Sequence, residues 1–253
     1  MKKLSICIPT YNRSSHLINC LNSIYLNGKI LEQIEICISD NNSSDDTSEI
    51  INSFKKKIDI KYNKNLNNIG VAKNILKSIS MSNSEFCWVI GDDDLLFDNA
   101  LEEVLKKINE FKDIDFFYIN SKHLDHSILN NYEKPINPNI LNEKMKNFSN
   151  QDIDMKCNFL DLINPQISFD YLGGLYLSVF RRSMWEKNLN RINTLKLDNK
   201  LLFSTFDNTF PHIRVFAHAF KNSKAFFYSK PLTINLYGVR EWKSLYPLVR
   251  SID

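Results

Sequence analysis

The chain has 253 residues, a length that suits one large α/β domain or two closely joined halves. Hydrophobic residues make up 43% and charged residues 24%, and the formal net charge of +3 is too small to indicate a nucleic-acid-binding protein. The five cysteines form no C-x-x-C pair, and no apolar run approaches the roughly 18 residues of a membrane span, so we expect a cytoplasmic protein with free thiols.

Apolar runs alternate with helical periodicity along the first ninety or so residues. Strands are expected at residues 4–8, 34–39, 58–62 and 86–90. Helices are expected between them, one of them starting at a capping box formed by Ser43 and Asp46. This alternation predicts a mostly parallel sheet with helices on both faces.

Unusual polar residues follow the ends of these predicted strands. Tyr11 follows the first strand, Asp40 ends the second, and Asp92, Asp93 and Asp94 follow the fourth. The carboxyl ends of parallel strands share one edge of a sheet, so these residues are expected at one nucleotide-sized site. The chain lacks both G-x-G-x-x-G and G-x-x-x-x-G-K-[ST] after the first strand, which disfavours a dinucleotide-binding fold and a P-loop NTPase.

Three adjacent carboxylates repel one another unless a cation joins them. Hard oxygen ligands suit Mg²⁺ or Mn²⁺, and Mg²⁺ is usually shared with substrate phosphates. The alternative is a solvated acidic turn before the helix predicted at residues 100–111. The buried strand in front of the aspartates favours the metal.

The second half of the chain is less regular. Strands are expected at residues 115–121, 175–180, 224–228 and 232–236, whereas the polar residues 122–156 are interpreted as an acceptor-side excursion or a lid. The tail, residues 237–253, mixes basic and aromatic side chains. It could lie on an anionic membrane, cover the catalytic face or form a dimer contact.

Four segments of the sequence occur in the order and spacing of a known family. They are Leu4–Arg13 (LSICIPTYNR), Ile36–Thr47 (ICISDNNSSDDT), Asn68–Asn74 (NIGVAKN) and Gly91–Asp94 (GDDD). Together they resemble family 2 glycosyltransferases of the GT-A fold over about residues 4–110. The Gly-Asp-Asp-Asp segment is similar to that of transferases of bacterial surface polysaccharides, including the abequosyltransferase-like group.

The resemblance implies roles for individual residues. The nucleotide would be bound by Pro9, Thr10, Tyr11, Arg13, Asp40, Lys73 and Asp92. Tyr11 would stack on the base and Asp40 would accept a hydrogen bond from it, although each also suits a purely structural role. Asp93 would ligate Mn²⁺ or Mg²⁺, with Asp94 and Asp92 as further candidate ligands. The common family pattern is Asp-x-Asp-Asp, and Gly91 replaces its first aspartate.

A catalytic base is expected in the second half of the chain. Family members usually place it as the Asp of a Glu-Asp pair at the start of a helix. Asp207 is the best match, although Phe206 replaces the Glu, and Asp170 is the second candidate. A carboxylate there would take the proton of the acceptor hydroxyl.

The resulting hypothesis is an α/β protein of the GT-A fold, with a nucleotide-sugar half at residues 1–121, an acceptor half at 122–236 and a tail at 237–253. It would be a metal-dependent glycosyltransferase that moves a sugar from a nucleotide-diphosphate donor to a glycan or lipid-linked glycan acceptor, with the inversion that the resemblance implies. It would work in the cytoplasm or peripherally at the inner membrane face. The alternatives are a catalytically silent nucleotide-sugar-binding scaffold and a sugar-nucleotide pyrophosphorylase.

Overall fold

A computed structural model describes residues 2–141, 145–167, 173–197 and 205–238. The strands in these ranges form one sheet in the order β3-β2-β1-β4-β9-β6-β10-β5, with β7 paired to β6 and β8 paired to β10. The strands are β1 (Leu4–Thr10), β2 (Ile34–Asp40), β3 (Ile60–Lys64), β4 (Phe86–Val89), β5 (Leu95–Leu96), β6 (Phe116–Asp125), β7 (Lys146–Asn147), β8 (Met155–Asn158), β9 (Ser178–Arg181) and β10 (Lys224–Tyr237).

The first four long strands match the predicted alternation. β1 pairs in parallel with β2 on one side and with β4 on the other, and β2 pairs in parallel with β3. Antiparallel β9 then joins β4 to β6, and β6 runs parallel to β10. The predicted α/β class with a mostly parallel central sheet is confirmed.

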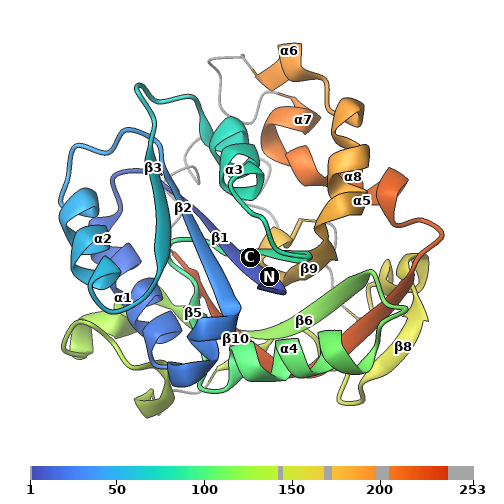
Figure 1. Ribbon diagram of the computed structural model, residues 1–253. Coiled ribbons are helices and arrows are strands. Elements are labelled where there is room, and N and C mark those ends of the chain that lie inside the picture. Colours follow the sequence, from blue (N-terminus) through green and yellow to red (C-terminus); the bar gives the residue numbers. More distant parts are fainter. Residues whose placement is uncertain (1, 142–144, 168–172, 198–204, 239–253) are drawn as a thin grey trace.

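Helices cover both faces of the sheet (Figure 1). They are α1 (Ser14–Tyr25), α2 (Thr47–Lys55), α3 (Val71–Ser80), α4 (Ala100–Glu110), α5 (Arg182–Lys187), α6 (Thr194–Leu197), α7 (Phe206–Thr209) and α8 (Pro211–Ala219). None of them, within the ranges described, combines the length and apolarity that a membrane span requires.

The alternation of side chains along β1 separates two hydrophobic cores. Leu4, Ile6 and Ile8 face the core that contains α1, α2 and α4. Cys7 faces the other core, which contains α3, α5 and α8. Successive side chains of a strand point to opposite faces, so a strand that is apolar throughout is buried between two helical layers. All five cysteines are free thiols, and four of them are buried, as predicted.

The second half of the chain differs from the prediction in three places. Of the strand predicted at residues 175–180, the first three residues form a 3-10 turn, and the strand is β9, Ser178–Arg181. The two strands predicted at 224–228 and 232–236 are one strand, β10, whose register against β6 shifts between Tyr228 and Thr233. The segment predicted as an excursion or lid contributes to the sheet instead, because β6 continues to Asp125, β7 pairs with β6 and β8 pairs with β10. The sequence does not reveal that β10 is continuous, because Pro231 and the flanking polar residues interrupt the apolar pattern that predicts strands.

The helix predicted to start at Ser43 begins at Thr47. The Ser43 hydroxyl accepts a hydrogen bond from the backbone N–H of Asn12, and Asp45 accepts one from the N–H of Thr47. The capping-box prediction is therefore wrong, because the Ser43 hydroxyl bonds to a neighbouring loop and the helix begins four residues later, at Thr47.

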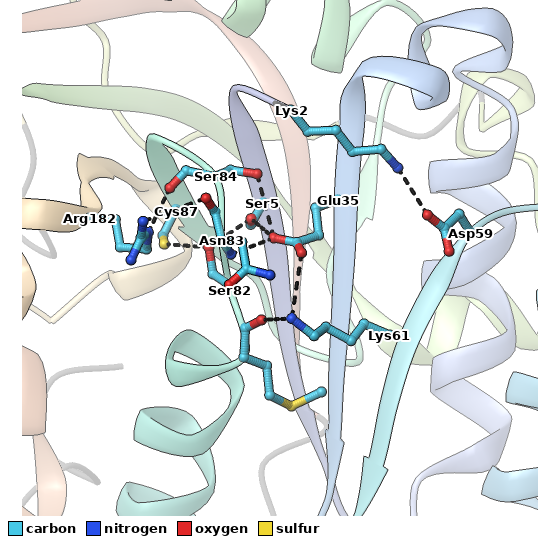
Figure 2. A network of polar contacts seen from close by, with 11 residues as sticks. Lys2, Ser5, Glu35, Asp59, Lys61, Ser82, Asn83, Ser84, Cys87 and Arg182 are labelled. Carbon is cyan, nitrogen blue, oxygen red and sulfur yellow. Dashed lines mark hydrogen bonds and ion pairs between the residues drawn. The ribbon is translucent and has the colours of Figure 1, made fainter.

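A polar network fastens the sheet at the edge where β1 and β2 begin (Figure 2). Glu35 on β2 accepts hydrogen bonds from the Ser5 hydroxyl at 2.5 Å and the Asn83 N–H at 2.8 Å, and Lys61 Nζ lies 3.7 Å from its other oxygen. Partial burial pushes the pKa of Glu35 upward, but these hydrogen bonds and the lysine charge outweigh it and lower the pKa below its ordinary value. The ionised carboxylate thus holds the turn before β4 against β1 and β2.

The variant Glu35→Gln is expected to unfold at a lower temperature than the native protein at pH 7. The lost charge-assisted hydrogen bonds are worth about 1 kcal/mol, or about 2–4 °C in Tm. A lowered pKa stabilises the fold above the unfolded value of about 4.3, and this contribution disappears as the pH falls through the folded value. In thermal denaturation, the difference in Tm between the native protein and Glu35→Gln should therefore become smaller as the pH is lowered. Glu32→Gln, at an exposed position, is the control; an equal effect there, or a pH-independent gap, would contradict the assignment.

Candidate functional site

A cavity of about 610 Å³ opens beyond the carboxyl ends of β1 and β4. Of the predicted site residues, Pro9, Thr10, Tyr11, Arg13, Asp92, Asp93 and Asp94 line it. The first turns of α3 and the segments around Tyr176 and Asn235 complete its wall. Open α/β sheets bind ligands at this edge, and residues from separate parts of the chain meet here as predicted.

Hydrogen bonds between backbone N–H groups and side chains fix the loop after β1 to the loop after β2. The N–H of Asn12 donates to the Ser43 hydroxyl at 2.9 Å, and the Asn12 side chain accepts from the N–H of Ser44 at 2.8 Å. Asn12 has a positive φ of 50°, a conformation that asparagine tolerates better than most residues. The neighbouring Tyr11 ring is 43% exposed and borders the cavity, so a flat ligand can reach it.

Asp92 and Asp93 are tied to the loop after β1. Thr10 Oγ1 donates to Asp92 Oδ2 at 2.8 Å. Arg13 makes ion pairs with both aspartates, with its Nε 3.1 Å from Asp92 Oδ1 and its Nη2 2.6 Å from Asp93 Oδ2. Asp92 is buried, whereas the Asp93 side chain is 17% exposed. Asp93 therefore presents a carboxylate to the cavity.

Asp94 is held from the opposite direction. Its Oδ2 accepts from the N–H of Gly91 at 2.6 Å, and its Oδ1 accepts from Asn235 Nδ2 at 2.9 Å. The amide nitrogen of Asn235 thus faces Asp94, and its amide oxygen faces away. That oxygen is buried and has no hydrogen-bond partner among the described residues.

The carboxylates are in an environment that opposes their charge. Burial raises the pKa of Asp92 to about 7, with the Arg13 charge acting in the opposite direction. Burial followed by the nearby charge of Asp93 raises the pKa of Asp94 to about 7. A cation or a hydrogen-bond donor brought to this cluster is therefore strongly favoured.

Gly91 leaves the space that the aspartates occupy. A Cβ at this position would lie 2.6 Å from Asp93 Oδ1 and 3.0 Å from Asp94 Oδ2. Real Cβ atoms do not approach other atoms this closely, so a side chain here would push the carboxylates away. The glycine thus fits the conformation in which Asp93 and Asp94 turn back over residue 91.

A network of asparagine amides holds the wall of the cavity, and sequence analysis did not assign these residues. Asn74 on α3 accepts from the Ser39 hydroxyl at 2.7 Å and donates to the carbonyls of Ser39 and Thr10 at 3.0 and 3.3 Å. Asn41 donates to Asn68 at 2.7 Å, and Asn68 accepts from the N–H of Gly70 at 2.9 Å. The asparagine-rich loop beside a predicted strand end is visible in the sequence. Hydrogen bonds between amides that are distant in the sequence produce no periodic pattern, so these contacts could not be predicted.

Two predicted nucleotide-binding residues stand apart from the cavity lining. Asp40 is fully buried and accepts from the N–H of Ser43 and from the Tyr62 hydroxyl, both at 2.8 Å. Asn41, the next residue, lines the cavity instead. Lys73 lies on α3 directly before the lining residue Asn74 but does not itself line the cavity.

Asp207 lies at the start of α7, beside α3. It is buried, and Arg214 Nε is 2.7 Å from its Oδ1. Its Oδ2 has no hydrogen-bond partner within the ranges that the structure describes. Asp207 is not a lining residue of the cavity, and Asp170 lies outside the described residues.

The aspartates supply only some of the ligands that a divalent metal ion needs. Among the described residues, no group of three or more His, Cys, Asp or Glu side chains is arranged to hold an ion. Asp93 Oδ1 accepts no hydrogen bond from the part of the chain that the structure describes, and it is a hard oxygen donor of the kind that Mg²⁺ and Mn²⁺ prefer. The residues therefore fit an ion that takes one or two carboxylates and completes its coordination with phosphate oxygens.

A twisted α/β sheet with a carboxylate-lined cavity at its carboxyl edge is an arrangement that can bind a phosphate-bearing ligand together with a divalent cation. The model of glycosyl transferase family 2 matches residues 5–165, which is more than half of the chain. The chain belongs to this family, and the resemblance predicted from its four segments is confirmed.

Two curated relatives match the first part of the chain. The abequosyltransferase RfbV of Salmonella typhimurium is 44% identical over 100 residues, which cover 39% of this chain and 30% of that protein. The GalNAc(5)-diNAcBac-PP-undecaprenol β-1,3-glucosyltransferase of Campylobacter jejuni is 37% identical over 112 residues, which cover 44% of this chain and 36% of that protein. The matches thus span about a third of the length of these relatives.

Solved structures share the fold over most of the chain. Staphylococcus aureus TarS 1-349 in complex with UDP-GlcNAc superposes with a TM-score of 0.70 at 16% identity, covering 96% of this chain and 61% of that one. The mannosyltransferase PcManGT of Pyrobaculum calidifontis, in complex with GDP-Man and Mn²⁺, gives a TM-score of 0.58 at 11% identity, covering 96% and 59%. These likenesses confirm the predicted GT-A fold.

The variant Gly91→Ala is expected to keep its fold but to bind a nucleoside diphosphate with Mn²⁺ about tenfold less tightly, because the new methyl group displaces Asp93 and Asp94. Titration calorimetry measures the change. Gly28→Ala is the control: Gly28 has a φ of 68° and open space around it, so that variant should lose stability without losing affinity. Unchanged affinity in Gly91→Ala would show that the packing at residue 91 does not position the site.

Proposed function

We propose that the protein transfers a sugar from a nucleotide-diphosphate donor to a hydroxyl of a bacterial surface glycan, with the help of a divalent metal. The observation that carries the proposal is the meeting of the first and fourth family segments in one cavity, which Tyr11 and Asp92–Asp94 both line. Membership of family 2 supports glycosyl transfer as the reaction.

The acceptor class is inferred from the relatives. One is named for abequose transfer and another for a glycan carried on PP-undecaprenol. Staphylococcus aureus TarP, 31% identical over 107 residues, is named for poly(ribitol-phosphate). These names share a bacterial surface polymer or its lipid-linked precursor, which supports a glycan or lipid-linked glycan as the acceptor here.

In this proposal the nucleotide lies between the loop after β1 and the first turns of α3. The exposed Tyr11 ring stacks on the base, while Thr10 and Asp92 lie on the ribose side. Asp40, buried and bonded to Ser43 and Tyr62, is the proposed acceptor of a hydrogen bond from the base. Lys73, next to the lining residue Asn74 on α3, is the proposed contact to the base or the phosphates.

Asp93, with Asp94 and Asp92 as further candidates, would hold Mn²⁺ or Mg²⁺ together with the donor diphosphate. A divalent ion at this position stabilises the negative charge that the leaving diphosphate gains. The protein's own contribution is to fix Asp93 against Arg13 and to keep Asp94 in place through Gly91 and Asn235. The binding of GDP-Man and Mn²⁺ by a protein of the same fold is consistent with this.

We infer that residues 1–121 serve the donor and residues 122–236 the acceptor. Most cavity-lining residues belong to the first part, and the second part supplies Leu175, Tyr176, Asn235 and Leu236. Asp207 takes the proton of the acceptor hydroxyl through its unbonded Oδ2, with Asp170 as the alternative base. Attack opposite the leaving diphosphate then inverts the anomeric carbon. The reaction would take place in the cytoplasm, with the tail as the candidate contact to the membrane.

The donor class can be tested by calorimetric titration with UDP, GDP, CDP and dTDP, with and without Mn²⁺. We expect one nucleotide to bind, and to bind more tightly with the metal. Asp93→Asn should lower the affinity measured with Mn²⁺ by about tenfold or more, because the metal loses a charged ligand. The exposed Asp98→Asn is the matched control. If no nucleotide binds, the scaffold alternative is favoured. If a nucleotide binds equally tightly with and without Mn²⁺, Asp93 is not a metal ligand.

The variant Asp207→Asn should keep nucleotide affinity and lose about 100-fold or more in the release of nucleoside diphosphate from the bound donor in the presence of acceptor glycan. Asparagine has the same shape but cannot take a proton. A competing explanation is that Asp207 anchors α8 through Arg214. Arg214→Gln breaks that ion pair and retains the carboxylate, so it separates the two roles: if it lowers turnover as far as Asp207→Asn does, Asp207 is an anchor.

A further inference from the structure

The negative charge of the aspartate cluster is already partly neutralised within the protein. Arg13 extends from the loop after β1, and its guanidinium bridges Asp92 and Asp93 at 3.1 and 2.6 Å. Its side chain is 25% exposed and lines the cavity. Arg13 therefore lies beside the carboxylates in the wall of the space that a ligand enters.

Most of the carboxylate oxygens in the cluster are engaged. Asp92 uses one oxygen for Arg13 and the other for Thr10. Asp94 uses its two oxygens for Gly91 and Asn235. Asp93 uses Oδ2 for Arg13, and only its Oδ1 accepts no hydrogen bond from the described residues. A divalent ion arriving alone would thus find one such oxygen on Asp93 and a guanidinium beside it.

We propose that Arg13 takes the place of the metal in the nucleotide-free protein and withholds the aspartates until a diphosphate arrives. The inference rests on the proposed function and deepens it, because it fixes how the site is assembled. A guanidinium leaves two carboxylates readily only if another anion accepts it, and its planar fork matches phosphate oxygens as well as it matches carboxylates. Entry of the diphosphate therefore releases Asp93 and supplies the remaining oxygens that a divalent ion needs.

Charge balance explains why this order is favoured. Without a bound ligand, removing Arg13 would leave the buried charge of Asp92 beside that of Asp93, which is costly in a low-dielectric site. With a diphosphate and a divalent ion present, the added negative and positive charges compensate each other, and Arg13 can pair with either partner. The single arginine thus makes the aspartates weak ligands for a metal alone and good ligands for a metal that arrives with phosphate.

The test is the affinity for Mn²⁺ alone, measured by calorimetry and by the loss of the free-Mn²⁺ electron paramagnetic resonance signal. Native protein should bind Mn²⁺ weakly without nucleotide. Arg13→Gln should bind it about tenfold or more tightly, since Asp92 and Asp93 then lack a cation. Adding Asp93→Asn to Arg13→Gln should abolish the gain, which would locate the new binding at the cluster. Arg182→Gln, which frees the exposed Glu186 from its ion pair, is the control and should gain nothing.

Stability gives a second readout. Arg13→Gln should melt at a lower temperature than the native protein, and Mn²⁺ alone should raise its Tm more than it raises the native Tm, since the ion binds only the folded state. Arg13→Lys keeps a point charge without the fork, so its affinity for Mn²⁺ should fall between the two and remains measurable if Arg13→Gln does not fold.

The proposal fails if native protein binds Mn²⁺ alone as tightly as Arg13→Gln does, or if neither variant at residue 13 gains affinity. Either result leaves the proposed function open, because that is judged by nucleotide binding to the native protein. Conversely, a gain of Mn²⁺ affinity in a protein that binds none of the four nucleotides would support the role of Arg13 and count against the transferase.

Discussion

The structure depends on the placing of three consecutive carboxylates at the end of a buried strand. Such a cluster is tolerated only where donors and cations reach it. Thr10 comes from the end of β1, Arg13 from the loop that follows, and Asn235 from the last described strand. The central sheet brings these positions to one edge, so the same architecture that buries the apolar residues also compensates the charge. A fold that failed to deliver them would leave ionised groups buried without partners.

Uncharged amides surround this charged centre. Asn74 joins the strand ends of β1 and β2 to α3, and Asn41 and Asn68 fix the loop that leads into that helix. An amide both donates and accepts, so it can bridge backbone groups without adding to the local charge. The cavity lining therefore combines neutral, hydrogen-bonded amides with carboxylates. This combination is suited to a ligand that has both a polar part and a charged part.

Sequence reasoning recovered the part of the fold that follows from periodicity. Apolar strands such as Leu4–Thr10 and Ile34–Asp40 were predicted to within one or two residues, and the order of strand and helix then gave the parallel sheet. It missed the continuity of β10 and the start of α2, because both depend on contacts between distant segments: β10 lies against β6, and Ser43 bonds to Asn12. Asn235 was missed for the same reason, since nothing in the local sequence of an apolar strand indicates that its asparagine bonds to Asp94.

The hydrogen bond between Asp94 and Asn235 joins residues 141 positions apart. During synthesis on the ribosome, the N-terminal strands and α1 to α4 emerge long before β10 does. Asp94 consequently spends that interval without its amide partner, next to two other carboxylates and in a half-built sheet that lacks the strand beside β6. The last described strand thus couples completion of the sheet to completion of the aspartate cluster, and a nascent chain acquires an ordered ligand site only after β10 has been made.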